Sequence, residues 1–347
     1  MSHTPIKYPS TNQFRQVIHN VMNTLSFGGV DENGNTKRKL LSPEETTLTY
    51  VGTVKLHGTN ASIVFYSEDD FVIQSKERII TPENDNANFA KWCLSRNIND
   101  LLNQVKWVCE QHEVNFEFPV EIAGEFAGRG IQKGVAIAET LPFLAIFGVA
   151  VGRKKSGMNW LPVTYTVGMG LPQDRIYSIF DFGCWYLDIP FHEPEAVQNG
   201  LASLTKSVED NCPAGKFFNV KDNTVGEGIV WKPVNEDLAS DSGTWFKIKG
   251  EKHSVSKVKT LAQVNPEKLK SIQDFVEYAV TENRMQQGLS EVGLDQSKVR
   301  EFLSWISRDI FKEESDVLGA NDLIMKDVAK LVSNKARAWY LNKLNNF

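Results

Sequence analysis

The sequence predicts an α+β protein with largely antiparallel sheets, followed by a small all-helical C-terminal domain. Short β-rich stretches recur up to residue 249 with few helical patterns between them, which is typical of antiparallel sheets and not of a doubly wound fold. The last part of the chain instead carries apolar residues at helical spacing. The length of 347 residues allows two domains. We place them at residues 1–255 and 256–347.

Helical and strand patterns alternate in the first half of the chain. Apolar residues at helical spacing predict a short helix over 11–24, which ends before the pair Gly28-Gly29. The polar, turn-rich segment 30–45 then leads into a β-branched strand over 47–54. The other elements expected in this half are strands at 60–66 and 71–75, a hairpin turn at 67–70 and a helical stretch over 86–113.

Strands dominate the next part, and helices the last. The expected elements are strands at 119–126, 143–151 and 161–168, a helix near 194–209, and strands at 227–232 and 244–249. Beyond them, Asn265 as N-cap and Pro266 at the first helical position open one helix. Apolar spacing predicts two further helices, over 299–310 and 324–340.

The composition excludes several classes of protein. Apolar residues make up 41% and charged residues 23%, so the chain is neither disordered nor collagenous. The net charge of −5 means that local basic clusters would have to bind any polyanion. No apolar run approaches the ~18 residues of a membrane span, and the four cysteines show neither a disulfide nor a zinc pattern. We therefore expect a cytoplasmic protein.

The most informative stretch is Lys55-Leu56-His57-Gly58-Thr59-Asn60. A lysine leaves the end of a predicted strand beside a glycine that allows a tight turn, so the lysine can face a cleft. This pattern is weak alone, because a solvated lysine before a turn is common. An ordered set of motifs follows it: Ser75-Lys76-Glu77-Arg78, Gly124-Glu125-Phe126-Ala127-Gly128, the apolar strand ending at Phe147, Glu227-Gly228-Ile229-Val230-Trp231-Lys232 and Trp245-Phe246-Lys247-Ile248-Lys249.

With these motifs in this order, the chain resembles the covalent nucleotidyltransferases, the superfamily of ATP-dependent polynucleotide ligases and mRNA capping enzymes. It is most similar to the RNA ligase 2 family of bacteriophages, with kinship to the trypanosome RNA-editing ligases. His57, where DNA ligases and capping enzymes usually have Asp, and the run Gly130-Ile131-Gln132-Lys133 indicate that branch. The resemblance covers residues 55–249 and implies an ATP-grasp-like nucleotidyltransferase domain followed by a helical domain.

The resemblance implies a role for each motif residue. Lys55 would attack the α-phosphate of ATP, forming lysyl-AMP and releasing pyrophosphate, and His57 would lie near that pyrophosphate. Asn60 would support the later steps, in which AMP passes to a 5′-phosphate and is displaced by a 3′-hydroxyl. The remaining implied roles are a hydrogen bond from the ribose to Glu125, adenine stacking on Phe147, metal-assisted chemistry at Glu227, α-phosphate binding by Lys247 and Lys249, and a nucleotide contact by Arg78, which we favour over Lys76.

Elementary chemistry supports this interpretation. A nucleophilic amine must be uncharged, whereas free lysine titrates at about 10.4. Lys247 and Lys249 alternate on a predicted strand and so point to one face, where their charges would lower the pKa of Lys55 and stabilise charge on phosphorus. Magnesium is expected, because it offsets phosphate charge and orients pyrophosphate.

Each residue also has an ordinary structural interpretation. Phe147 would by composition belong to the core, and Lys247 and Lys249 could face solvent on an exposed sheet. His57 could be a loop histidine and Asn60 a turn residue. Glu125 and Glu227 lie in apolar strands, where a buried carboxylate needs a partner, so a solvated role is disfavoured. The chain also departs from the family pattern, with Val54 in place of an acidic residue and Gly148 in place of Asp.

The implied substrate is RNA with 3′-hydroxyl and 5′-phosphate ends, in particular a nick in duplex RNA, bound mainly through phosphate and sugar. We expect a monomer with no protein partner. The alternatives are a DNA ligase or a GTP-dependent capping enzyme, which His57 and the helical C-terminus disfavour, and a nucleic-acid-binding protein with an inactive site. Candidate basic clusters are Lys37-Arg38-Lys39, Arg153-Lys154-Lys155 and, the favoured one, Lys247, Lys249, Lys252, Lys257 and Lys259.

Overall fold

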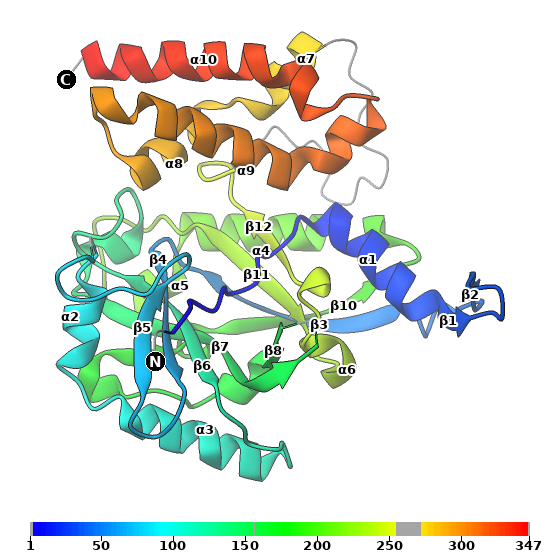
Figure 1. The fold of residues 1–347 in the computed structure, drawn as a ribbon, viewed down its shortest axis with the longest axis vertical. Helices are drawn as coiled ribbons and strands as arrows, with labels where there is room; N and C mark the ends of the chain where they lie inside the picture. The colour runs from blue at the N-terminus through cyan, green and yellow to red at the C-terminus, as the bar shows by residue number, and fades with distance from the viewer. Residues whose placement is uncertain (1–2, 86, 156, 255–271, 346–347) are drawn as a thin grey trace.

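The computed structural model shows a mixed α/β body with a stack of helices against one side (Figure 1). The structure describes residues 3–85, 87–155, 157–254 and 272–345. It confirms the predicted fold class, because antiparallel sheets form the body and helices follow at the C-terminal end. The helix start at Asn265-Pro266 and the division after residue 255 lie outside the described residues, so the two-domain division stays a prediction.

Two sheets form the body. The smaller one has the strand order β10-β3-β11-β12, and the larger one has the order β5-β4-β6-β7-β8, with β9 beside β7. All neighbours pair antiparallel except β7 and β9. The strands are β3 (Thr47–Lys55), β4 (Thr59–Phe65), β5 (Phe71–Ser75), β6 (Val120–Ala127), β7 (Phe143–Lys154), β8 (Gly157–Trp160), β9 (Ile176–Ser178), β10 (Cys184–Pro190), β11 (Gly228–Pro233) and β12 (Phe246–Lys249).

Helices complete the two cores of the body. Helix α1 (Phe14–Ser26) buries Phe14, Val17, Ile18 and Val21 at helical spacing against the smaller sheet, which α4 (Gln198–Asp210) also covers. Helices α2 (Phe89–Leu94) and α3 (Asn99–Gln111) pack on the larger sheet, and α5 (Pro213–Phe217) and α6 (Glu236–Ala239) are short.

The C-terminal helices have a core of their own. They are α7 (Ile272–Ala279), α8 (Glu282–Val292), α9 (Val299–Ala320) and α10 (Met325–Asn345), and we call them the helical bundle. The predicted helices over 299–310 and 324–340 are confirmed as parts of α9 and α10. None of the helices in the described residues is both long and apolar enough to cross a membrane.

A shared carboxylate fastens the helical bundle to the body. Glu314 of α9 is fully buried and accepts hydrogen bonds at 3.1 Å from Arg15 of α1 and at 3.1 Å from Arg284 of α8. Arg15 also pairs with Asp316 at 2.6 Å, and Arg284 with Asp309 at 2.8 Å. Buried charges are tolerated only when paired, so this network fixes how α9 lies on the body.

Some predicted elements differ from the observed ones. A strand over 161–168 is wrong: β8 ends at Trp160, and Pro162 precedes a 3-10 helix over Val163–Thr166. The helical stretch over 86–113 divides into α2 and α3. Within the described residues, five strands lie where none was expected: β8 and β9 of the larger sheet, β10 of the smaller sheet, and the two strands of an exposed hairpin, β1 (Phe27–Val30) and β2 (Thr36–Arg38).

Candidate active site

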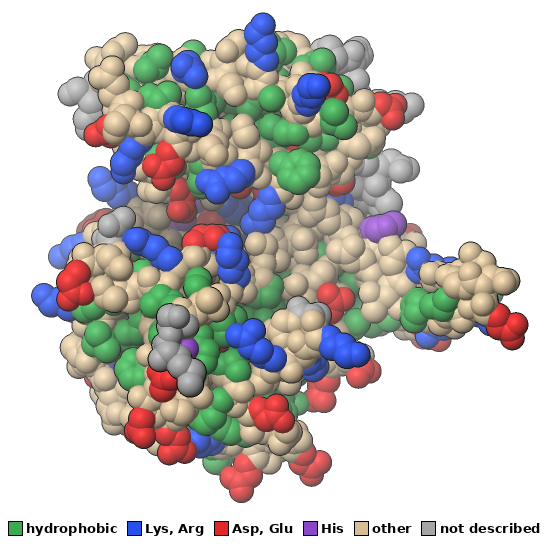
Figure 2. All heavy atoms as spheres, in the orientation of Figure 1, with side chains coloured by type: hydrophobic (Ala, Val, Ile, Leu, Met, Phe, Trp, Pro, Cys, Tyr) green, Lys and Arg blue, Asp and Glu red, His purple; other side chains and the backbone are tan. Residues whose placement is uncertain are grey.

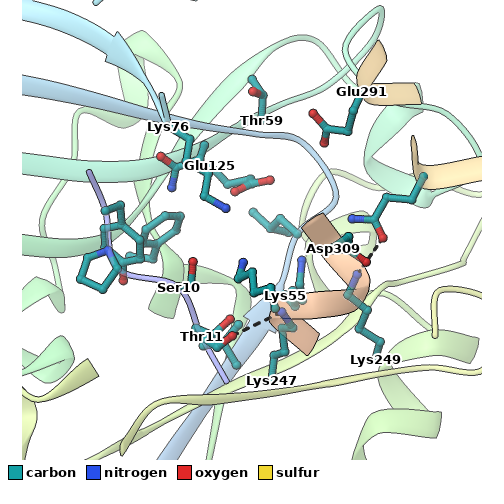
Figure 3. Close-up of a pocket in the computed structure, with 18 of the residues that line it drawn as sticks. Ser10, Thr11, Lys55, Thr59, Lys76, Glu125, Lys247, Lys249, Glu291 and Asp309 are labelled. Carbon is teal, nitrogen blue, oxygen red and sulfur yellow. Dashed lines mark hydrogen bonds between the residues drawn. The ribbon is translucent and has the colours of Figure 1, made fainter. Parts of the chain in front are cut away.

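A cavity of about 870 Å³ lies between the body and the helical bundle. Its walls come from three parts of the chain: the N-terminal segment Tyr8–Thr11, the strand ends of the body, and helices α8 and α9 (Figure 3). The predicted site residues that line the cavity are Lys55, Asn60, Glu125, Phe147, Lys247 and Lys249. The structure therefore brings together residues that are far apart in the sequence.

Strand register places Glu227 between two lysines. Gly228, at the start of β11, is opposite Lys55 of β3 on one side and Lys249 of β12 on the other. The preceding residue, Glu227, is 3% exposed, and its carboxylate lies 2.8 Å from the Lys55 amine and 3.3 Å from the Lys249 amine. His57 Nδ1 is 3.5 Å from the same carboxylate. The predicted nucleophile and the predicted metal residue are thus in direct contact.

The charge state of Lys55 differs from the expectation. Burial of the Lys55 amine acts to lower its pKa, but attraction to the Glu227 and Glu125 carboxylates outweighs burial and raises the pKa above its usual value. The expected lowering by Lys247 and Lys249 is wrong for this arrangement, because Glu313 of α9 pairs with Lys247 at 2.8 Å and Glu227 pairs with Lys249. The Lys55 amine is therefore held as an ammonium beside Glu227 in this arrangement.

Lys247 and Lys249 project from one face of β12, as the alternation predicted, while the intervening Ile248 is buried. Lys247 also donates to the Thr11 carbonyl at 3.3 Å, and Lys249 donates to Gln287 of α8 at 3.4 Å. Burial lowers the pKa of Lys249, although Glu227 opposes the effect. Both lysines are therefore held in the cavity wall and do not form a solvent-facing pair.

Glu125 is bound to the turn that follows Lys55. Its carboxylate accepts a hydrogen bond from the Gly58 N–H at 2.9 Å. A Cβ on Gly58 would lie 2.3 Å from the Phe126 carbonyl, so only glycine allows this approach of the turn to β6. Burial raises the pKa of Glu125 to about 7, with Lys55 acting in the opposite direction. Gly58 thus connects the first motif, residues 55–60, to the second motif, residues 124–128.

Three aromatic rings and a buried lysine surround Phe147. The Phe147 ring packs edge-on against Tyr8 at 4.9 Å between centroids, and the Phe147 carbonyl accepts a hydrogen bond from Lys232 at 3.1 Å. Lys232 also donates to the Tyr8 hydroxyl at 2.8 Å and lies 4.2 Å from the Trp245 ring centroid. Phe147 is only partly buried and lines the cavity, so one of its edges is available to a base.

The sequence reasoning missed Tyr8 and Lys232 as lining residues. Lys232 is the last residue of the motif that begins at Glu227. A lysine near the end of an apolar strand could have indicated that its side chain lines the cavity. Tyr8 carried no signal, because its neighbours come from distant strands. A Cβ on Gly148 would lie 3.2 Å from the Tyr8 ring, so the glycine that replaces the family's Asp makes room for this tyrosine.

Replacing Lys232 by methionine should change how stability depends on pH. Burial lowers the pKa of Lys232 to about 7, and in the described residues it forms no ion pair. An unfolded lysine titrates at about 10.4, so between these values the unfolded chain binds more protons and wild-type stability rises with pH, by at most about 1.4 kcal/mol per pH unit. Below about pH 7 Lys232 is protonated in both the folded and the unfolded chain, so the full free-energy cost of burying its charge lowers the stability of the wild type.

Urea unfolding at about pH 6 and about pH 9 checks this expectation. The difference in unfolding free energy between wild type and the K232M variant should move in favour of the wild type as the pH rises. An equal difference at both values would show that Lys232 does not lose its proton on folding.

Arg78 does not lie in the cavity wall, whereas Lys76 does. The Arg78 side chain is exposed and donates to the Asn84 carbonyl at 2.9 Å in its own loop. Lys76 directly follows Ser75, the last residue of β5, and the geometry therefore favours it over Arg78. Neither His57 nor Glu227 lines the cavity. His57 contacts the Glu227 carboxylate and has His253 beside it at 5.4 Å between ring centroids.

The polar groups beside Lys55 suit a hydrated cation and not a preformed metal cage. In the described ranges, no three His, Cys, Asp or Glu side chains gather into a metal site. The Asn60 side-chain oxygen is buried, and no described group donates to it. Mg²⁺ binds through one or two protein oxygens and keeps its remaining places for water and phosphate. Glu227 and Asn60 fit that requirement.

Comparisons with known proteins give the family of the chain. The family model described as RNA ligase matches residues 48–249, which is more than half of the chain. A search of curated proteins gives no significant match.

Similar solved structures include mutants of the Naegleria gruberi RNA ligase. One, with AMP and Mn, has 14% identity and a TM-score of 0.40, and the match covers 70% of this chain and 56% of that one. Another, with ATP and Mn, has 14% identity and a TM-score of 0.38, and the match covers 71% and 62%. The chain thus spans just over half the length of the first of these structures.

Proposed function

Because the chain belongs to the RNA ligase family, we propose that it is an ATP-dependent ligase that joins RNA 3′-hydroxyl and 5′-phosphate ends through lysyl-AMP on Lys55. The observation that supports this proposal is that the Glu227 carboxylate lies within 3.3 Å of two amines, those of Lys55 and Lys249, both of which line the cavity. A lysine, a carboxylate and a second lysine in this order supply a nucleophile, a site for a cation and a charge that stabilises a phosphate.

In the first step, the Lys55 amine attacks the α-phosphorus of ATP. The N–P bond forms, the bond from the α-phosphorus to the bridging oxygen breaks, and pyrophosphate leaves with the electron pair. The neutral amine loses one proton to solvent and keeps the other on the phosphoramidate nitrogen. Lys247 and Lys249 stabilise the negative charge on the α-phosphate as the attack proceeds. Glu125 lies where it can accept a hydrogen bond from the ribose, and Phe147 where it can stack on adenine.

Two further steps regenerate the free Lys55 amine and seal the RNA. A 5′-phosphate oxygen of the RNA attacks the AMP phosphorus, which breaks the N–P bond and gives adenylylated RNA. The 3′-hydroxyl then attacks that 5′-phosphorus, the phosphodiester forms and AMP leaves. Asn60, which lines the same cavity as Lys55, would orient the reacting phosphates in these steps.

A divalent cation, Mg²⁺ in our proposal, would be held by Glu227 and Asn60 and would offset the phosphate charge and orient the leaving pyrophosphate. Glu227 bound to such a cation would attract the Lys55 ammonium less strongly, which would lower the pKa of Lys55 and favour the uncharged amine. This accounts for an ion pair that would otherwise oppose nucleophilic attack.

A labelling experiment tests the proposal. The protein is incubated with magnesium and α-labelled ATP or GTP and then separated on a denaturing gel. We expect a covalent AMP adduct that is stable to base and labile to acid, as a phosphoramidate is. A GMP adduct would instead favour a capping enzyme, and the absence of any adduct would favour a binding protein with an inactive site.

We further propose that the preferred substrate is a nick in duplex RNA and that the protein acts as a monomer. A panel of nicked duplexes with RNA or DNA on each side of the nick, beside single-stranded ends, tests the substrate. Sealing of the RNA nick should exceed that of the other substrates. Preferential sealing of DNA nicks would favour the DNA ligase alternative.

A further inference from the structure

We propose that Arg308 and Lys312 of the helical bundle, together with Lys76 of the body, bind the two outer phosphates of ATP, which leave as pyrophosphate. This inference rests on the proposed function for the identity of the nucleotide. It assigns to the helical bundle a part in the first chemical step, which neither the sequence motifs nor the family match includes, since both end at residue 249.

The positions of the three cations support this assignment. Arg308 and Lys312 are four residues apart on α9, so they share one face of the helix, and both line the cavity. Lys76 lines the same cavity from the body. In the space-filling view, Lys and Arg side chains gather along the furrow between the helical bundle and the body (Figure 2). Cations from two separately packed units thus face one space.

Among the described residues that line the cavity, seven lysines and arginines outnumber five carboxylates. Glu77 attracts both Lys76 and Arg308, but its ion pair is with Lys7 at 2.7 Å. The carboxylate nearest to Lys312 is that of Glu313, which is 4.0 Å from Lys312 but 2.8 Å from Lys247. Asp309, on the same face, is bound to Arg284 at 2.8 Å.

The environment of Lys312 also indicates an anion site. Burial lowers the pKa of Lys312 to about 8, and repulsion from Lys247 and Lys76 adds to this effect against the opposing charges of Glu313 and Asp309. Like charges held around one cavity repel one another, and a bound polyphosphate would relieve that repulsion.

The order of groups along ATP matches the order of the cavity walls. Phe147 of β7 and Lys232 of β11 lie at the base end, and Lys247 and Lys249 of β12 lie at the α-phosphate. The wall that remains is α9, where the close-up places Asp309 across the cavity from the segment containing Ser10 (Figure 3). The outer phosphates therefore extend toward the face of α9 that carries Arg308 and Lys312.

Binding measurements on the full chain test the assignment. Isothermal titration with inorganic pyrophosphate and with AMP is carried out on wild type and on the R308Q and K312Q variants, with K326Q, an exposed lysine of α10, as the matched control. Each cavity variant should weaken pyrophosphate binding by about 5- to 30-fold, which is the usual effect of losing one charge-assisted contact. AMP binding should stay unchanged, and the K312R variant should retain pyrophosphate binding.

A second measurement separates pyrophosphate from RNA as the ligand. Sealing of RNA that is already adenylylated needs no pyrophosphate contact, so R308Q and K312Q should seal it at the wild-type rate. Unchanged pyrophosphate affinity in both variants, equal weakening of AMP binding, or slower sealing of adenylylated RNA with normal pyrophosphate binding would each overturn the proposal. Since pyrophosphate binding is measured without catalysis, its result is independent of whether the labelling experiment gives an adduct.

Discussion

Replacing Lys55 by alanine should abolish formation of the AMP adduct, with a fall in the adenylylation rate of at least about 10³-fold. The Lys55 amine lies at the cavity in contact with Glu227, and Lys249 contacts the same carboxylate. None of the other described lysines that line the cavity belongs to the first motif, residues 55–60. The measurement is the rate of label transfer from α-labelled ATP, followed on denaturing gels.

Two further variants make this result specific. The K55R variant keeps a cation beside Glu227 but is a poor nucleophile, so it should also form no adduct while remaining folded. The K91A variant changes an exposed lysine of α2 and should label at the wild-type rate. Label on the K55A variant at more than a few per cent of the wild-type amount would show that another residue is the nucleophile.

Replacing Glu314 by glutamine should destabilise the protein by about 3 kcal/mol or more. The substitution preserves the shape of the side chain but removes the charge that Arg15 and Arg284 share. The Arg284 side chain is fully buried and also donates to the Ala279 carbonyl, so among the described residues Asp309 would be left as its one carboxylate partner. Urea unfolding followed by far-UV circular dichroism should show a lower midpoint for the E314Q variant.

The matched control is E301Q, in the first turn of the same helix, where Glu301 is exposed. It should leave the unfolding midpoint within the range of ordinary surface substitutions, about 0.5 kcal/mol. Equal midpoints for E314Q and wild type would show that the shared carboxylate contributes nothing to the attachment of the bundle.

The sequence was sufficient for the parts of the fold that depend on local patterns. β-Branched runs such as the one ending at Lys55 became strands, and the apolar spacing from Val299 and from Ile324 became parts of α9 and α10. The edge strand β10 and the β1–β2 hairpin were missed because their side chains are mostly exposed or half-buried, so they show no clear apolar alternation. The strand expected over 161–168 failed because Pro162 ends the pairing.

In the candidate site, too, some features could be predicted from the sequence and others could not. Motif order was enough to expect Lys55, Glu125, Phe147, Lys247 and Lys249 around one cavity. The partners that set their charge could not be read from spacing: Glu313 comes from α9, and Tyr8 from a segment without secondary structure. These contacts depend on how the helical bundle and the N-terminal segment pack against the sheets of the body. The local sequence pattern contains no information about that packing. The charge of Lys247 is a case in point, since Glu313 offsets it from the far end of the chain.

The link between Arg15 and α9 has a consequence for biosynthesis. Its hydrogen bonds join residues 298 to 301 positions apart, so a ribosome must synthesise the chain as far as Asp316 before all of them can form. Until then the Arg15 guanidinium lacks its carboxylate partners on α9, and the cavity lacks the wall that α9 supplies. The cavity therefore assembles only after residue 316 has been synthesised, and products that end before this residue would lack the link between α1 and α9.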